Sequence, residues 1–193
     1  MESINYSWIV VLLLFCCIGC TNQQDYSPKP RGFFRIKFPE KVYKKAETGC
    51  PFSFEIPTYA VLNQEDKSHP CWKNVDFPQF NARLHVSYMT ITDKTPLSQL
   101  TEDARTFAFK HTTKATAIDQ SVIKSKQSNA TGVQYDISGN TASNYQFYLT
   151  DSSKHYFRAA LYFNEKPHVD SIAPVLDFIK KDINHLIASF WWK

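Results

Sequence analysis

The sequence predicts an α+β fold in which two helices pack on an antiparallel sheet. Two observations lead to this fold class. Apolar and polar residues alternate in six segments, as in strands that bury one face. Two further segments repeat their apolar residues at spacings of three and four, as in amphipathic helices.

The six alternating segments predict the strands of the sheet. Every second residue in each is apolar, so each strand would direct one row of side chains into a core. Residues 151–154 (DSSK) form a polar link between the last two segments and predict a hairpin there. The predicted strands are residues 33–38, 52–56, 83–88, 133–137, 145–150 and 155–163.

The first helix is predicted to follow Thr95 and Pro96, which suit an N-cap and a first helical turn. The second helix is predicted to start near Asp170, with Pro174 in its first turn, where a missing N–H costs little. The apolar stripe of the first helix is Leu97, Leu100, Ala104, Phe107, Ala108 and His111. That of the second is Ile172, Val175, Leu176, Ile179, Ile183, Leu186, Ile187 and Phe190.

The order of these elements, strands, helix, hairpin and long C-terminal helix, resembles the Mog1/PsbP-like arrangement. Residues 32–193 contain no second linker or repeat and predict a single globular domain. Residues 20–31 are polar and contain two prolines, so we expect a flexible tether that reaches at most about 35 Å.

The first twenty residues predict export and lipidation. The apolar run from Trp8 to Ile18 is too short to span a bilayer, which takes about twenty residues, but it suits a secretory signal. Gly19 and Cys20 resemble a lipobox, in which the cysteine is lipidated and the bond before it is cut. We therefore expect a signal peptide over residues 1–19 and a lipid on Cys20. An uncleaved membrane anchor is the alternative.

Charge and cysteine usage agree with export. The chain has a formal net charge of +4, and its charges are interspersed, so no nucleic-acid partner is expected. Cys50 and Cys71 are an even pair in the folded part and predict a disulfide in an oxidising compartment. Two buried free thiols are the alternative.

Motifs for catalysis are sparse. The six histidines lack zinc-hydrolase spacing, and no phosphate-binding or dinucleotide-binding glycine loop occurs, so we expect no metal, no cofactor and no enzymatic activity. A hydrolase could use Ser143 or Ser153 with His155 and Asp151. These residue types are also ordinary turn formers.

Aromatic residues make up 15% of the chain. Many lie on the apolar faces of predicted strands, but one strand also carries tyrosines and an arginine on its other face, and these residue types are enriched at protein interfaces. Ordinary packing, or an apolar ligand pocket between sheet and helices, are alternatives. The candidate partner-binding residues are Tyr156, Arg158, Tyr162, Trp191 and Trp192.

Several longer segments occur in one order between about Tyr26 and Lys193. They are PKPRGFFRIKFPEKVY, CPFSFEIPTYA, CWKNVDFPQF, FAFKHTTKA, YDISGNTASNYQFYLTDSSKHYFRAALYFN, DSIAPVLDFI and HLIASFWWK. Together they resemble the gliding-motility lipoprotein GldD family of Bacteroidota. The N-terminal signal departs from the usual form, because it has no basic residue before the apolar run and has Cys17 three residues before the acceptor.

The resemblance implies a lipid-anchored envelope component of the gliding apparatus, which in this phylum is linked to type IX secretion. It implies assembly with other gliding-motility lipoproteins and envelope components, and no known reaction. It also implies that Cys20 is the lipid acceptor and that Cys50 and Cys71 are the matching pair. Thr21 stands where an Asp would favour retention in the inner membrane, so we expect the periplasmic side of the outer membrane.

Overall fold

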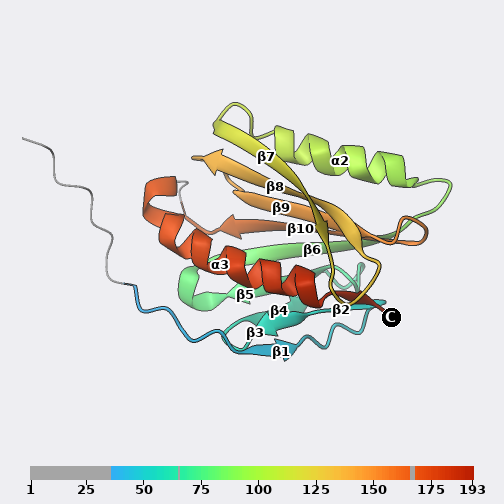
Figure 1. Ribbon diagram of the computed structural model, residues 1–193, viewed down its shortest axis with the longest axis horizontal. Helices are drawn as coiled ribbons and strands as arrows, with labels where there is room; N and C mark the ends of the chain where they lie inside the picture. The colour runs from blue at the N-terminus through green and yellow to red at the C-terminus, as the bar shows by residue number, and fades with distance from the viewer. Residues whose placement is uncertain (1–35, 65, 166–167) are drawn as a thin grey trace, which may run out of the picture. The chain divides into compact units, whose positions relative to one another are not determined.

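The centre of the fold is a seven-stranded sheet in which every pair of neighbouring strands is antiparallel (Figure 1). The computed structural model describes residues 36–64, 66–165 and 168–193. In spatial order the strands are β4 (Val61–Gln64), β5 (Lys73–Phe77), β6 (Ala82–Thr90), β10 (His155–Phe163), β9 (Tyr145–Thr150), β8 (Thr131–Gly139) and β7 (Ala115–Lys124).

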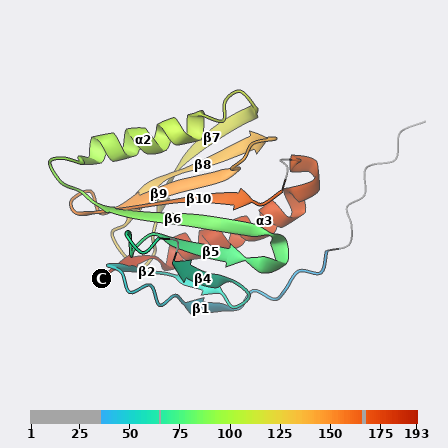
Figure 2. The same cartoon turned by 180° about the vertical axis from the view of Figure 1, so that it is seen from behind.

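Two helices, α2 (Leu97–Phe109) and α3 (Val169–Ser189), pack on opposite faces of this sheet. Strand β10 shows the division, because its residues alternate between the faces. Phe157 and Leu161 lie in the core beneath α3, whereas the hydroxyl of Tyr156 donates a hydrogen bond to the Leu100 carbonyl of α2, at 2.9 Å. Figure 1 is seen from the α3 side and Figure 2 from the α2 side. The predicted α+β class, with two helices on an antiparallel sheet, is confirmed.

Two short antiparallel ladders complete the fold. Strand β1 (Tyr43–Lys45) pairs with β3 (Glu55–Pro57), and β2 (Phe52–Ser53) pairs with β11 (Trp191–Trp192). The prediction that residues 52–56 form one strand of the central sheet is therefore wrong, because the segment divides at Phe54 between these two ladders. A single 3-10 turn, η1 (Pro78–Phe80), links β5 to β6. The second ladder brings the C-terminus beside the first third of the chain (Figure 1).

Aromatic rings fill the core where this ladder meets the sheet. Phe157 lies at the centre, with its ring centroid 5.2 Å from that of Phe52, 6.0 Å from that of Phe54 and 5.0 Å from that of Phe190. All four side chains are 0% exposed. Aromatic pairs in such edge-to-face arrangements stabilise one another beyond the area they bury.

A buried carboxylate, that of Asp182, ties the N-terminal part of the described chain to α3. One oxygen accepts hydrogen bonds from Lys41 Nζ at 2.7 Å and from the Tyr43 hydroxyl at 3.0 Å, and the other accepts from the Tyr59 hydroxyl at 2.5 Å. The Asp182 side chain is 1% exposed. Desolvation, followed by the hydrogen bond to Asp182, raises the pKa of Tyr43 to about 12 and that of Tyr59 further. Both tyrosines therefore remain donors at neutral pH.

The hairpin of β9 and β10 and the presence of both helices agree with the sequence prediction. Helix α3 begins at Val169, one residue before Asp170, so Pro174 is its sixth residue and lies inside the helix; the prediction that it occupies the first turn is wrong. The prediction of a strand at 33–38 is wrong for residues 36–38, the part that the structure describes. The ring of Phe38 instead stacks on that of Phe178 in α3, with centroids 4.4 Å apart. Packing of a non-strand segment against the helix therefore accounts for its partial burial. The predicted cap of α2 is wrong by one residue: Pro96, not Thr95, holds the N-cap position, with no side-chain cap, and the Thr95 hydroxyl instead contacts that of Thr92 at 2.7 Å.

Three strands of the sheet, β4, β5 and β7, were not predicted from the sequence. In β7 every residue is exposed or half-buried, and β4 is likewise mostly exposed, so neither shows clean alternation. β5 is short and lies between two turns. Strands near sheet edges need fewer apolar residues, which removes the pattern on which the prediction depends.

Residues 36–193 form one compact unit. The predicted signal peptide, Cys20 and the tether lie outside the described residues. Within the described part of the chain, no helix is long and apolar enough to cross a membrane.

Candidate docking surface

One half of the sheet face on the α2 side is open. Tyr156 and Arg158 on β10 contact α2, through the Leu100 carbonyl and the Phe107 ring respectively. Figure 2 shows β6, β5 and β4 on this side with no described helix in front of them. Side chains from these three strands and from the end of β10 therefore reach the surface.

Four polar and aromatic side chains meet on this open half. The register sets Arg83 of β6 beside both Asp76 of β5 and Tyr162 of β10. The rings of His85 and Tyr162 pack edge to face with centroids 5.3 Å apart. Val61 of β4, which is 46% exposed, lies opposite Asp76 and extends the surface toward the sheet edge.

These side chains line a depression of about 590 Å³ at the ends of β6 and β10. Asp76 is held by Arg83, whose guanidinium contacts both carboxylate oxygens, and by the Asn63 amide at 2.6 Å. Partial burial disfavours the Asp76 carboxylate, but the Arg83 and Asn63 hydrogen bonds outweigh it and lower the pKa. The depression is lined by Asp76, Pro78, Asn81, Ala82, Arg83, His85, Tyr162, Phe163 and Asn164.

The prediction that Tyr156 belongs to an exposed docking face needs correction. Its side chain is 0% exposed, because α2 covers it, and burial raises the pKa of its hydroxyl. Arg158 is half-buried against Phe107 and donates to the Gln146 side chain at 2.8 Å. Tyr162, at the far end of the same strand, is half-exposed and lines the depression.

Trp191 and Trp192 are half-exposed in β11. The Trp192 ring stacks on His155 at 5.1 Å and meets Phe190 edge to face at 4.6 Å. Trp191 lies under the Lys45 ammonium at 4.8 Å. Both indoles thus have packing partners within the chain, and Trp191 remains the more peripheral of the two.

The structure does not bring the predicted hydrolase residues together as a triad, because neither the Ser143 nor the Ser153 hydroxyl hydrogen-bonds the His155 ring. The Ser143 hydroxyl is buried and makes no hydrogen bond with any described group. Burial disfavours the Asp151 carboxylate, but backbone N–H groups of the hairpin turn lower its pKa to about 2. His155 Nδ1 contacts the Tyr88 hydroxyl at 2.6 Å. Among the described residues, no cluster of three potential metal ligands occurs.

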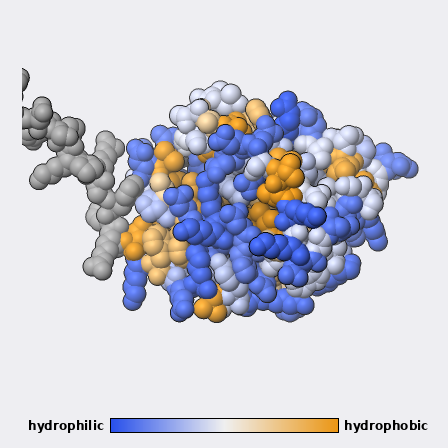
Figure 3. Space-filling model, in the orientation of Figure 1, coloured by the Kyte–Doolittle hydropathy of each residue, from blue (hydrophilic) through white to orange (hydrophobic). Residues whose placement is uncertain are grey.

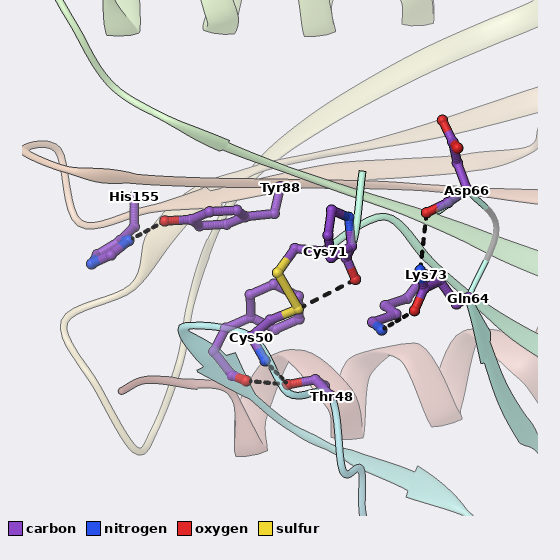
Figure 4. The surroundings of a disulfide bond; sticks show 10 residues. Thr48, Cys50, Gln64, Asp66, Cys71, Lys73, Tyr88 and His155 are labelled. Atoms are coloured by element: carbon purple, nitrogen blue, oxygen red, sulfur yellow. Dashed lines mark hydrogen bonds between the residues drawn. A yellow bond between two sulfur atoms is a disulfide. The ribbon is translucent and has the colours of Figure 1, made fainter. Parts of the chain in front are cut away.

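Cys50 and Cys71 form a disulfide with a Cα–Cα distance of 5.7 Å (Figure 4). It joins the segment before β2 to the turn before β5 and encloses β2, β3 and β4. Beside it, the Thr48 hydroxyl donates to the Phe52 carbonyl at 2.7 Å and accepts from the Cys50 N–H at 3.2 Å. The disulfide thus cross-links a region whose strands are only two to four residues long.

Replacing both cysteines with serine is expected to lower the free energy of unfolding by about 3 kcal/mol, because the unfolded chain regains the freedom of a loop of about 22 residues. Guanidinium unfolding of the wild type and the variant measures the difference. A thiol reductant should lower the midpoint of the wild type and leave that of the variant unchanged. Equal midpoints for the two oxidised proteins would contradict the prediction.

Exposed apolar side chains are scattered over the described surface. Figure 3 shows the apolar areas of the α3 side as separate patches among hydrophilic residues. The large apolar side chains that are most exposed are Val42, Val61, Phe107 and Val122. A docking surface of mixed polar and aromatic character therefore fits this protein better than one broad apolar patch.

Sequence reasoning identified Tyr162 but not its neighbours in the depression. Arg83 and His85 alternate with the core residues Leu84 and Val86 of a predicted strand, so their outward direction was available from the sequence. Their meeting with Tyr162 was not, since it depends on the pairing of β6 with β10, two strands far apart in the chain.

Comparison with known proteins identifies the family. No curated protein matches the chain. Among solved structures, the solution structure of cyanobacterial PsbP (CyanoP) from Synechocystis sp. PCC 6803 is similar, with 12% identity and a TM-score of 0.45, over 85% of this chain and 98% of that one. The family model described as gliding motility lipoprotein GldD matches residues 23–192, nearly the whole chain. This chain therefore belongs to the gliding motility lipoprotein GldD family.

Proposed function

We propose that this protein is a non-catalytic docking subunit of the gliding-motility machinery linked to type IX secretion. A lipid on Cys20 would hold it on the periplasmic side of the outer membrane, and residues 21–31 would let the folded part clear the headgroups. Membership of a gliding-motility lipoprotein family supports the setting. The open half of the sheet face supports docking as the mode of action.

The observation that carries this proposal is the group formed by Arg83, His85 and Tyr162 on the open half of the sheet face. Tyrosine and arginine are enriched where proteins bind one another, and an aromatic anchor within a polar depression is a common centre of such contacts. The partner would be another envelope protein of the machinery. Trp191, beside Lys45, is the other predicted contact residue that remains half-exposed.

An affinity pull-down of the full-length lipoprotein from gently solubilised envelopes tests the docking surface. Wild type is expected to recover other gliding or secretion components, and a Tyr162→Ala/His85→Ala variant to lose them. Lys181→Ala, an exposed change on the α3 side, is the control and should recover them in full. Circular dichroism checks that the double variant folds. Equal recovery by all three proteins would contradict the docking surface.

Cys20→Ser is expected to move the protein from the membrane fraction to the soluble fraction, because acyl chains anchor at about 0.8 kcal/mol per buried methylene. Immunoblots of fractionated envelopes measure the distribution. Cys17→Ser serves as the control and should stay membrane-bound. A Cys20→Ser protein that remains in the membrane would point to an uncleaved anchor instead.

The depression also favours a second candidate, a binding module for a small polar ligand. Its volume of about 590 Å³ falls in the range of small-molecule sites, and it carries donors and acceptors around one aromatic ring. Native mass spectrometry of protein purified from its own envelope would reveal a bound ligand as added mass. Loss of that mass in Tyr162→Ala, with partner recovery unchanged, would favour this candidate over docking.

A further inference from the structure

Strand β7 forms one edge of the sheet, and no other described strand lies against its outer side. It is ten residues long, and its one register shift occurs at its start, between Ala115 and Ala117. Its middle, residues 117–123, has no proline, glycine or lysine and one charged residue, Asp119, and Val122 is 82% exposed. Proteins usually protect long edges with bulges, prolines or charges, and here the register shift and Lys124 stand only at the two ends, so the middle of β7 is suited to pair with another strand.

The backbone groups that β7 offers can be identified from its ladder with β8. The Ile137 N–H of β8 donates to the Asn144 carbonyl at 2.9 Å, so Ile137 directs its backbone groups away from β7. Ile118 lies opposite Ile137 and, because antiparallel ladders alternate, directs its own N–H and C=O outward. Gln120 and Val122 follow at steps of two and do the same.

We propose that the occupant of this edge is a second copy of the same chain, paired antiparallel about a twofold axis at Gln120. In this register Ile118 of each copy faces Val122 of the other, which covers two apolar side chains on the α2 side. Asp119 of each copy faces Ser121 of the other, whose hydroxyl can donate to the carboxylate. All the outward backbone groups of Ile118, Gln120 and Val122 are then hydrogen-bonded.

Neighbouring registers are less favourable. A twofold axis at Asp119 sets two carboxylates directly opposite each other, which is repulsive. An axis at Ser121 sets Ile118 opposite Lys124 and leaves the apolar side chains without apolar neighbours. A shift by a single residue is excluded, because paired residues would then point to opposite faces of the continuous sheet. Of these registers, the axis at Gln120 is therefore the most favourable.

This interface is separate from the docking surface. Strand β7 is one edge of the sheet, whereas Val61 and Asp76 belong to β4 and β5 at the other edge. Both surfaces can therefore be occupied together, so pairing through β7 would present two docking surfaces on one assembly. The proposal does not depend on the identity of any docking partner.

A charge-swap experiment tests the twofold axis. Two differently tagged copies of the full-length lipoprotein are co-expressed, and recovery of one with the other is measured after mild solubilisation. Gln120→Lys in both copies, or Gln120→Glu in both, sets like charges opposite each other and is expected to reduce recovery about tenfold. One copy with Gln120→Lys and the other with Gln120→Glu is expected to restore it.

The matched control is Gln99, an exposed glutamine on α2, changed to Lys and Glu in the same combinations. Recovery should then equal that of the wild type in every combination. Gln120 is itself exposed, so at a protein concentration too low for pairing, where association does not add to stability, thermal unfolding should show the same midpoint for its variants as for wild type. Undiminished recovery with like charges at 120, failure of the mixed pair to restore it, or no recovery of the wild-type pair would overturn the proposal.

Discussion

Asp182→Ala is expected to lower the free energy of unfolding by about 3–5 kcal/mol, the range found when one partner of a buried ion pair is removed. The change leaves the Lys41 ammonium and the hydroxyls of Tyr43 and Tyr59 without their shared acceptor. It also releases the segment around β1 from α3. Guanidinium unfolding followed by circular dichroism measures the loss.

Two further variants distinguish the cost of leaving a buried charge unpaired from the effect of an alanine substitution in α3. Lys181→Ala alters the adjacent exposed position of α3 and should change the stability by no more than about 0.5 kcal/mol. Lys41→Met combined with Asp182→Ala also removes the ammonium that has lost its carboxylate partner, so this double variant is expected to be more stable than Asp182→Ala alone. An Asp182→Ala protein as stable as Lys181→Ala would show that the carboxylate does not hold the two parts together.

Phe157→Ala is expected to cost about 3–5 kcal/mol, because it removes the ring at the centre of the aromatic core and leaves a cavity. The rings of Phe52, Phe54 and Phe190 would lose their shared neighbour, and with it the contact between the C-terminal ladder and the sheet. Denaturant unfolding is again the measurement, with the near-ultraviolet spectrum as a report on aromatic packing.

Phe107→Ala is the matched control, since it makes the same substitution at a side chain that is 42% exposed. Its loss removes contacts with Arg158 and Lys110, for which we expect about 1 kcal/mol or less. Similar losses for the two phenylalanines would contradict the assignment of Phe157 to the centre of the core.

The candidate docking surface shows which features of a site the alternation of apolar and polar residues can predict. Alternation along 155–163 correctly separated Tyr156, Arg158 and Tyr162 from the core residues between them, but it could not tell which of the three α2 would cover. The helix crosses only part of that face, so Tyr156 is buried and Tyr162 half-exposed, although they lie on the same side of one strand. That difference comes from a contact between elements more than fifty residues apart.

What the sequence by itself determined is what short-range periodicity and local chemistry encode: both helices, the β9–β10 hairpin, the inward faces of the alternating strands, and the family. The tertiary structure alone decided the strand order, the edge strands β4 and β7, the burial of Asp182 and the meeting of Arg83 with Tyr162. The physical reason is that alternation reports only whether a side chain faces a core. Which strand lies beside which, and which face a helix covers, depends on contacts between residues distant in the chain, and these leave no local pattern.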